Sequence, residues 1–234
     1  MHFIHKLADE LMEKRGRDTL EILEIGAGTG RYSIALCEEG HSVTAAELSA
    51  SNLGRLKKKK SGVKAMQRDA RNLSGIKDES FDLVLLLGPL YHLHAFEDRQ
   101  KALLEAKRVL RRDGYLLAAY CMNEYSILTY GFWKHHIKEA LLSGQVDESF
   151  HTLADANELY SYVRLSDIDE LKEAAGLERA FIFAADGAAN YRRDQLRQLS
   201  EEEFELFLRY QLATCCLPEL LGASAHTVDV LRRS

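Results

Sequence analysis

The sequence predicts an α/β fold built on a doubly wound sheet, and three features of its 234 residues support that prediction. Strand-like and helix-like segments alternate between residues 19 and 121, which is typical of right-handed βαβ crossovers. The segment 81–87 is nearly all apolar, as expected of a central parallel strand covered on both faces. Three closely spaced glycines, Gly26, Gly28 and Gly30, lie between a strand-like and a helix-like segment. Such a turn lets the backbone come close to a ligand.

Each element has its own local signal. Strands are expected where short apolar runs stand between turn or helix signals, at 20–25, 42–47, 63–68, 81–87, 115–121, 177–184 and 226–231. Helices are expected where apolar residues recur at helical spacing or a stop signal follows, at 29–39, 49–60, 96–110 and 166–175. Gly40 closes the first helix, and the cations at 57–60 complement the dipole of the second. Asp113-Gly114 predicts a turn before the fifth strand, and the run from Ser200 to Glu203 matches a capping box that begins a further helix.

The alternation stops between residues 122 and 165, where aromatic and histidine side chains are frequent. We expect this segment to form a helical cap inserted after the fifth strand, at the ligand edge of the sheet. Trp133 and His136 are its candidates for the acceptor side of a pocket; packing under the insertion is the alternative for Trp133, and surface exposure for His136. With no repeat or interdomain linker in the sequence, one domain over residues 1–234 is expected, with the cap inside it.

Composition and charge narrow the function classes. A net charge of −5 leaves no basic footprint for nucleic acid. No apolar stretch approaches membrane-spanning length, so no membrane partner is expected. The four cysteines show no Cys-x-x-Cys or Cys/His ligand spacing, so neither a metal site nor a disulfide framework is predicted. The first residues do not read as a secretory signal, and a cytoplasmic location is expected.

The spacing of the glycines indicates which ligand the turn serves. A dinucleotide fingerprint would need its third glycine at position 31, which is Arg31, and no P-loop lysine follows. Glu24, at the end of the preceding strand, is a poor neighbour for a pyrophosphate and suits a ligand that carries a positive charge beside an adenosine. Glu47 ends the second strand, where a carboxylate can accept both ribose hydroxyls. Asp69 ends the third strand, where it could reach an adenine amino group.

These residues resemble the motifs of the class I S-adenosylmethionine-dependent methyltransferases. Residues 23–30, Leu-Glu-Ile-Gly-Ala-Gly-Thr-Gly, look like the first motif of the family, residues 44–49 like its second and residues 67–70 like its third. Residues 81–93 are similar to its fourth strand and the loop that follows, whereas residues 109–116 stand where the family usually has a Pro-Gly-Gly turn. The match is strong over roughly residues 19–121 and loose over 164–234. It implies a Rossmann-like sheet of seven strands with the last one antiparallel.

The resemblance also implies S-adenosylmethionine as cofactor, with S-adenosylhomocysteine as product. The residues implied to bind it come from the three motifs and the end of the fourth strand: Glu24, Gly26, Ala27, Gly28, Gly30, Arg31, Glu47, Leu48, Asp69, Ala70, Leu87 and Gly88. In this assignment the glycine turn approaches the methionine part, with Glu24 near its ammonium group. Glu47 binds the ribose, and Leu48 packs on the adenine. Arg31 either contacts the cofactor from the first helical turn or is a surface residue.

The implied reaction is an in-line attack of an acceptor atom on the sulfonium methyl, so the protein mainly aligns the reactants and excludes water. Pro89, Tyr91 and His92 begin the substrate side. A base is needed only when the acceptor arrives protonated. His92 is the candidate for that role, since imidazole ionises near neutral pH; packing beside the cofactor is the alternative.

The acceptor is predicted only as a class. Gly88-Pro89-Leu90-Tyr91 stands where an Asn-Pro-Pro-Tyr motif would mark the branches that methylate adenine or glutamine amides. We therefore expect a small-molecule acceptor that takes the methyl group on O, N, S or C, with the oligomeric state open. A non-catalytic S-adenosylmethionine-binding protein is one alternative. An NAD-dependent oxidoreductase is the other, and the absence of glycine at position 31 argues against it.

Overall fold

The computed structural model describes residues 1–153 and 157–233 and contains one seven-stranded sheet in the order β3-β2-β1-β4-β5-β7-β6. Strands β1 to β5 pair in parallel, and β7 is antiparallel to both of its neighbours. The predicted doubly wound sheet with an antiparallel last strand is therefore confirmed. The strands are β1 (Glu21–Ile25), β2 (Ser42–Glu47), β3 (Lys64–Gln67), β4 (Phe81–Leu86), β5 (Leu110–Cys121), β6 (Leu177–Ala184) and β7 (His226–Arg233).

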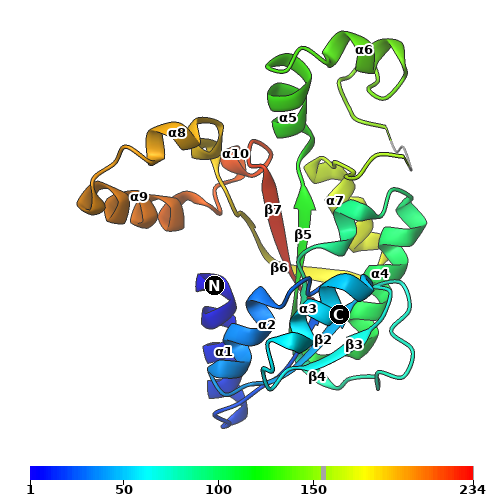
Figure 1. Ribbon diagram of the computed structural model, residues 1–234, viewed down its shortest axis with the longest axis vertical. Helices are drawn as coiled ribbons and strands as arrows, with labels where there is room; N and C mark the ends of the chain where they lie inside the picture. The colour runs from blue at the N-terminus through cyan, green and yellow to red at the C-terminus, as the bar shows by residue number, and fades with distance from the viewer. Residues whose placement is uncertain (154–156, 234) are drawn as a thin grey trace.

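Helices cover both faces of the sheet (Figure 1). The α-helices are α1 (His2–Arg15), α2 (Arg31–Glu38), α3 (Ala50–Lys58), α4 (Phe96–Val109), α5 (Asn123–Ser126), α6 (Ile137–Leu142), α7 (Leu165–Ala174), α8 (Arg193–Leu196), α9 (Glu201–Thr214) and α10 (Pro218–Leu221). Two short 3₁₀ segments and one π-helical segment complete them: η1 (Pro89–His92), η3 (Ala188–Arg192) and η2 (Ile127–Phe132). Within the described residues, no helix is both long enough and apolar enough to span a bilayer.

Strand β4 forms the centre of two hydrophobic cores. Leu83 and Leu85 pack on the side of α1 and α2, whereas Val84 and Leu86 pack on the side of α4 and α7. All four side chains are fully buried, as the apolar run 81–87 predicts for a strand covered on both faces. Truncating one of these leucines to alanine would cost about 2–5 kcal/mol of stability, because it leaves a cavity in each case.

Two elements differ from the expectation. Helix α1 was not predicted, although Ile4, Leu7, Ala8 and Leu11 recur at helical spacing and are buried. The turn predicted at Asp113-Gly114 is wrong, because β5 runs without interruption from Leu110 to Cys121. A Cβ atom on Gly114 would stand 2.5 Å from the backbone oxygen of Asp82 in β4. A glycine is therefore needed at position 114 because the backbones of β5 and β4 approach closely there, and not because the chain turns.

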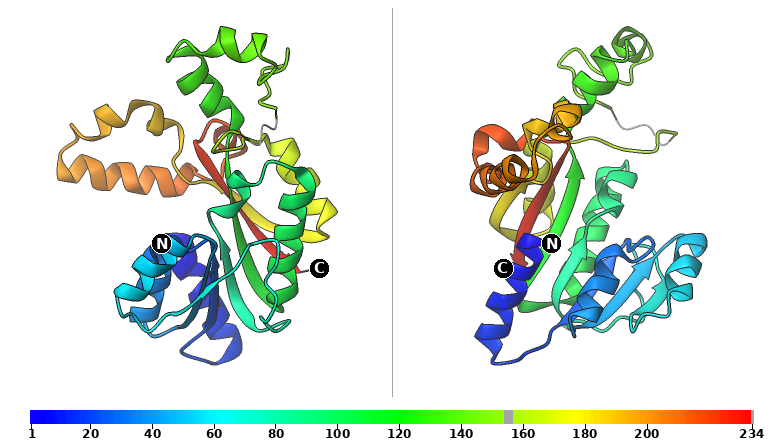
Figure 2. Two further views of the ribbon diagram at one scale, coloured as in Figure 1. Left: turned by 45° about the vertical axis from the view of Figure 1, so that its right-hand side comes forward. Right: turned by 60° about the vertical axis from the view of Figure 1, so that its left-hand side comes forward.

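The segment predicted as a helical cap leaves the sheet at the end of β5 and returns at α7 (Figures 1 and 2). Its two ends are joined by hydrogen bonds from the Asn123 amide to the Val163 carbonyl at 2.9 Å and from the Val163 amide to the Cys121 carbonyl at 3.0 Å. Helical structure covers α5, η2 and α6, and residues 143–153 and 157–164 form turns, isolated bridges and irregular chain. The cap is therefore helical only in its first half, and residues 154–156 of the predicted range lie outside the described residues.

Helices α8 and α9 form an arm that projects from the sheet beyond β6 (Figure 2). The predicted capping box is confirmed at its start: Ser200 Oγ accepts from the Glu203 amide, and the Glu203 carboxylate accepts from the Ser200 amide at 2.8 Å. The arm touches the rest of the molecule near the end of α9, where Gln211 Nε2 donates to the Ala184 carbonyl at 3.5 Å. This end of α9 borders the site described next.

Candidate functional site

The glycine turn joins β1 to α2 and has three residues in left-handed conformations, with φ of 75° at Gly26, 57° at Gly28 and 83° at Gly30. A Cβ atom on Gly26 would stand 2.6 Å from the Pro89 ring, and one on Gly30 would stand 2.3 Å from the Leu56 side chain. These two glycines permit close packing inside the protein. A Cβ atom on Gly28 would meet nothing within 4 Å, so open space over the turn is available to a ligand.

Glu47 connects the glycine turn to the next strand end. Its carboxylate accepts from the Gly28 amide at 2.7 Å and from the Ser49 amide at 2.8 Å, and the residue is 7% exposed. The adjacent Leu48 is 59% exposed, an unusual exposure for leucine. A rigid carboxylate beside an exposed apolar side chain suits a ligand that has vicinal hydroxyls next to a flat apolar ring.

Glu24 points into the protein. It is 3% exposed, and one carboxylate oxygen accepts from both the backbone amide (2.9 Å) and the hydroxyl of Ser33 in the first turn of α2. Burial raises the pKa of Glu24 to about 7, although the Ser33 hydrogen bonds oppose the shift. In this conformation the Glu24 carboxylate stabilises the first turn of α2. The contact of Glu24 with a ligand ammonium group stays a prediction.

The third strand end carries an ion-pair network. The carboxylate of Asp69 accepts from Arg71 Nη2 at 2.7 Å, and Arg71 Nη1 donates to Asp98 at 2.7 Å. Hydrogen bonding to Arg71 holds the pKa of Asp69 below its usual value. The adjacent Ala70 is buried at 7% exposure. A ligand amino group at Asp69 would therefore share this carboxylate with Arg71.

At the end of β4 the backbone turns through Leu87 and Gly88 into η1. The Tyr91 hydroxyl donates to the Leu87 carbonyl at 3.1 Å, and a Cβ atom on Gly88 would lie 3.6 Å from both the Gly26 carbonyl and that hydroxyl. Burial raises the pKa of Tyr91 to about 12, so it remains a hydrogen-bond donor at neutral pH. Together with Pro89, which touches Gly26, these residues bring the end of β4 against the glycine turn.

The three other substrate-side candidates lie apart from one another. His92 Nδ1 lies 3.0 Å from the Leu159 carbonyl, and its ring lies 5.1 Å from the ring of Tyr160. His136 stacks on Tyr130 at 4.4 Å within the cap. Trp133 is 53% exposed and meets Tyr191 edge-on, so it is not packed under the insertion. The structure therefore does not bring His92, Trp133 and His136 together.

Two cavities flank η1. One, of about 550 Å³, lies within the cap and is lined by His136, Tyr130 and Tyr160. The other, of about 540 Å³, borders the glycine turn and the end of β4, and we call it the turn-side cavity. The described residues that line it come from α1, α2, β4, η1, β5, β6, α9 and β7: Met1, His2, Phe3, Ile4, Arg31, Tyr32, Leu87, Tyr91, Leu117, Ala119, Phe183, Ala184, Ala185, Asp186, Gln211, Leu212, Cys215, His226 and Val228.

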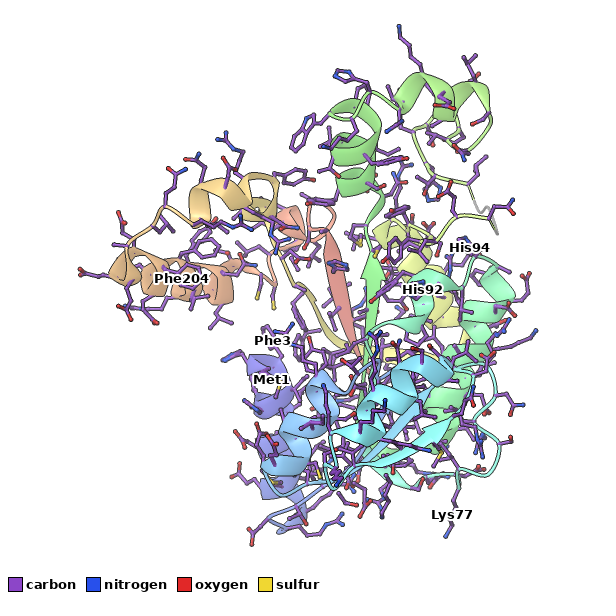
Figure 3. The ribbon with its side chains drawn as sticks, viewed as in Figure 1. Met1, Phe3, Lys77, His92, His94 and Phe204 are labelled. Atoms are coloured by element: carbon purple, nitrogen blue, oxygen red, sulfur yellow. The ribbon has the colours of Figure 1, made fainter. Side chains whose placement is uncertain are left out.

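Figure 3 shows that the start of α1 and His92 lie on different sides of β5 and β7. Met1 and Phe3 stand at the start of α1, below the arm that carries Phe204, whereas His92 lies across β5 and β7 on the side of α4. Met1 and Phe3 are among the residues of the turn-side cavity, and His92 is not among the described residues that line it.

Comparison with known proteins shows a methyltransferase fold and a match to one domain family. Residues 23–118 match the model of a family described as a methyltransferase domain. Over these residues the chain is similar to the class I S-adenosylmethionine-dependent methyltransferases. The methyltransferase match covers the first three motifs, β4 and most of β5. S-adenosylmethionine is the methyl donor of this family.

Similar proteins support the same family. The chain is 36% identical over 101 residues to a glycine/sarcosine N-methyltransferase of Parasynechococcus marenigrum, and this match covers 41% of this chain and 36% of that protein. A protein with the same description from Aphanothece halophytica is 33% identical over 120 residues, or 49% of this chain and 45% of that one. The chain thus spans less than half the length of these curated relatives. A solved S-adenosylmethionine-dependent methyltransferase of Methanosarcina mazei shares the fold, with a TM-score of 0.65 and 16% identity over 99% of this chain and 96% of that one.

The residues of the methyltransferase turn fit the cofactor of the family. A Cβ atom on Gly28 would have open space, the Glu47 carboxylate is fixed by the amides of Gly28 and Ser49, and Leu48 is exposed beside it. Nothing lies within 4 Å of a Cβ atom placed on Gly28, so the backbone of the turn is open to a ligand at this position.

Sequence reasoning missed His226 and Asp186, which line the turn-side cavity beside Tyr91. A signal for His226 was present: an antiparallel last strand starts at the edge where the parallel strands end, so its first residue faces the site. Nothing local in the sequence could have identified Asp186, because its contact with His226 joins residues 40 positions apart.

Proposed function

We propose that this protein transfers the methyl group of S-adenosylmethionine to a small-molecule acceptor that binds in the turn-side cavity. The observation that supports the proposal is that the expected cofactor site and the turn-side cavity share residues. Arg31 and Leu87, which the family resemblance assigns to the cofactor, also line this 540 Å³ cavity. A cofactor held at the glycine turn would therefore meet an acceptor without any further rearrangement of the fold.

The cofactor, when bound, supplies an electrophilic methyl group on a positively charged sulfur. In the proposal, Glu47 accepts from the ribose hydroxyls, Leu48 packs on the adenine and the backbone around Gly28 contacts the methionine part. The remaining task of the chain is to align the acceptor and exclude water. Tyr91, whose hydroxyl is held on the Leu87 carbonyl, forms the wall between the proposed cofactor and acceptor positions.

The names of similar proteins suggest which functional group of the acceptor takes the methyl group. Two of them are described as glycine/sarcosine N-methyltransferases, which supports a small amine as one acceptor to test first. The net charge of −5 supports the proposal that nucleic acid is not the acceptor.

His92 is the proposed general base for an acceptor that arrives protonated and extends from the turn-side cavity past η1, because His92 itself is not among the described residues that line the cavity. Its Nδ1 lies on the Leu159 carbonyl, which fixes that nitrogen as the donor in a neutral ring and leaves Nε2 as the acceptor for a proton. The cap residues Trp133 and His136 are proposed to contact only an acceptor that extends out of the turn-side cavity, because His136 lines the separate cap cavity and neither residue is among the described residues that line the turn-side cavity.

A methyl-transfer assay tests the function directly. The full chain is incubated with S-adenosylmethionine labelled on its methyl group, with glycine, sarcosine and a panel of other small amines, phenols, thiols and carbon acids. Label should appear in at least one acceptor, and Gly28→Val should abolish the transfer because a β-branched side chain would fill the open space over the turn at a positive φ. Binding of S-adenosylhomocysteine with no transfer to any acceptor would instead support the non-catalytic alternative.

A further inference from the structure

His226 is the first residue of β7, and the antiparallel pairing of that strand places it at the ligand edge of the sheet. It stands opposite Cys121, the last residue of β5, in the register of the two strands. Its ring lies 6.1 Å from the ring of Tyr91, centroid to centroid, and both residues line the turn-side cavity. A titratable side chain therefore faces the space where the proposed acceptor binds.

Asp186 holds the imidazole of His226 in a fixed position. One oxygen of the carboxylate lies 2.7 Å from Nδ1 and accepts from the His226 backbone amide at 2.9 Å. The fully buried Ser224 fixes the loop that carries Asp186: its hydroxyl accepts from the amides of Asp186 and Gly187, at 3.2 and 3.1 Å, and donates to the His226 carbonyl at 2.6 Å. This framework orders the pair before any ligand binds.

The charge on the cavity wall is positive. The hydrogen bond to Asp186, followed by one to the Cys121 side chain, raises the pKa of His226 to about 10 against the opposing effect of burial, so the ring is charged at neutral pH. Arg31 adds a second cation to the same lining. Asp186 is the one carboxylate among the described lining residues, and its charge is already matched by His226. A charged imidazole has two N–H donors, and Asp186 takes the one at Nδ1. The Cys121 side chain also forms a hydrogen bond with the ring, but sulfur is a weak acceptor, so a carboxylate would replace it at Nε2.

We propose that His226, held by Asp186, binds a carboxylate of the methyl acceptor, with Arg31 adding to the positive field of that wall. The proposal rests on the proposed function and defines its substrate class as small molecules that carry an acid group. The imidazolium would attract an anion at this position, and the positively charged sulfur of a cofactor held at the glycine turn would add to that attraction. The aromatic side chains of Phe3, Tyr32 and Phe183 on the same lining would contact the apolar part of the acceptor.

The alternative is that the pair only braces the loop between β6 and β7. If the pair only stabilises the loop, the affinity of a ligand in the cavity should not depend on its charge. If the pair binds a carboxylate, an acid should bind more tightly than its neutral amide. Matched acids and amides therefore separate the two roles. The probes are phenylacetate against phenylacetamide and propanoate against propanamide, titrated by calorimetry into the full chain saturated with S-adenosylhomocysteine.

The wild-type protein should bind at least one acid about tenfold more tightly than its amide, because a charge-assisted hydrogen bond is lost in the amide. His226→Gln should reduce that preference to about twofold or less, and Asp186→Asn should also reduce it, since the ring is then neither held nor kept charged. A matched control is His5→Gln, which removes an imidazole that lies 3.1 Å from the carboxylate of Glu39 outside the cavity. The preference should survive in that variant.

Affinity for S-adenosylhomocysteine separates failure of this proposal from failure of the proposed function. It is measured first on each variant and should change by less than about threefold in His226→Gln, since the proposed site binds the acceptor. The carboxylate site is refuted if wild type shows no preference for either acid, binds neither pair, or keeps the preference in His226→Gln. A wild-type chain that does not bind S-adenosylhomocysteine would refute the function itself. Thermal melting of Asp186→Asn and His226→Gln confirms that both variants are folded.

Discussion

Glu47 offers a sharp test of the cofactor site, because two effects of its removal can be measured apart. In the structure its two carboxylate oxygens accept from the amides of Gly28 and Ser49 at 2.7 and 2.8 Å. The family resemblance implies that the same carboxylate accepts hydrogen bonds from the ribose hydroxyls. Glu47→Gln keeps an acceptor oxygen and the side-chain length but loses the charge, whereas Glu47→Ala loses both backbone contacts.

The magnitudes follow from the bonds involved. Hydrogen bonds to a charged group contribute about 1.5–3 kcal/mol, so Glu47→Gln should weaken binding of S-adenosylhomocysteine by about 10-fold to 150-fold. Glu47→Ala should weaken it at least as much. It should also lower the free energy of unfolding by about 1–3 kcal/mol, because the amides of Gly28 and Ser49 lose their partner at a residue that is 7% exposed.

Calorimetry measures the affinity and urea unfolding measures the stability of each variant. Glu38→Gln is the matched control, since it removes an exposed carboxylate from the surface of the neighbouring α2; both quantities should stay near the wild-type values. If Glu47→Gln bound S-adenosylhomocysteine as tightly as wild type, the ribose would be held by another group, and the carboxylate of Glu47 would serve only to join the two loops.

Three further predictions concern the base, the cap and a buried acid. His92→Ala should lower kcat by about 10²-fold with little change in cofactor affinity, measured by steady-state kinetics with both substrates varied; a loss of cofactor affinity at unchanged kcat would assign His92 to packing. Hydrogen exchange in residues 122–165 should slow when cofactor and acceptor are both bound, and protection confined to the glycine turn and Glu47 would make the cap purely structural. Burial raises the pKa of Glu24 to about 7 from a usual value of 4.5, so the folded protein keeps a proton that the unfolded chain releases, and stability falls as pH rises through that window. Glu24→Gln should therefore be more stable than wild type at pH 8, by on the order of 3 kcal/mol, and lose this advantage below about pH 4.5 in urea unfolding; an equal difference at both pH values would contradict the assigned cause.

The sheet could be predicted because its signals are local. The alternation of apolar runs with helical stripes placed the strands to within about two residues, apart from the early start of β5 at Leu110. The error at Asp113-Gly114 has a physical cause, because a glycine permits either a turn or the close approach of a neighbouring backbone, here that of Asp82. Only the tertiary contact distinguishes the two.

The site was less accessible to sequence reasoning. The positions of Glu47 and Leu48 followed from their place at a strand end, but the inward orientation of Glu24 did not, because it depends on Ser33, nine residues further along the chain. His226 and Asp186 meet only when β6 and β7 are paired. The sequence therefore predicted the side chains whose position depends on one strand end. It did not predict the side chains whose position depends on a contact between two distant segments.

The central claim is that the glycine turn holds S-adenosylmethionine, and calorimetry of the purified chain with S-adenosylhomocysteine and with NAD tests it most directly. The account predicts that S-adenosylhomocysteine binds in the micromolar range, about −8 kcal/mol, and raises the melting temperature, while NAD does neither. Tighter binding of NAD than of S-adenosylhomocysteine, or no binding of S-adenosylhomocysteine at all, would contradict it.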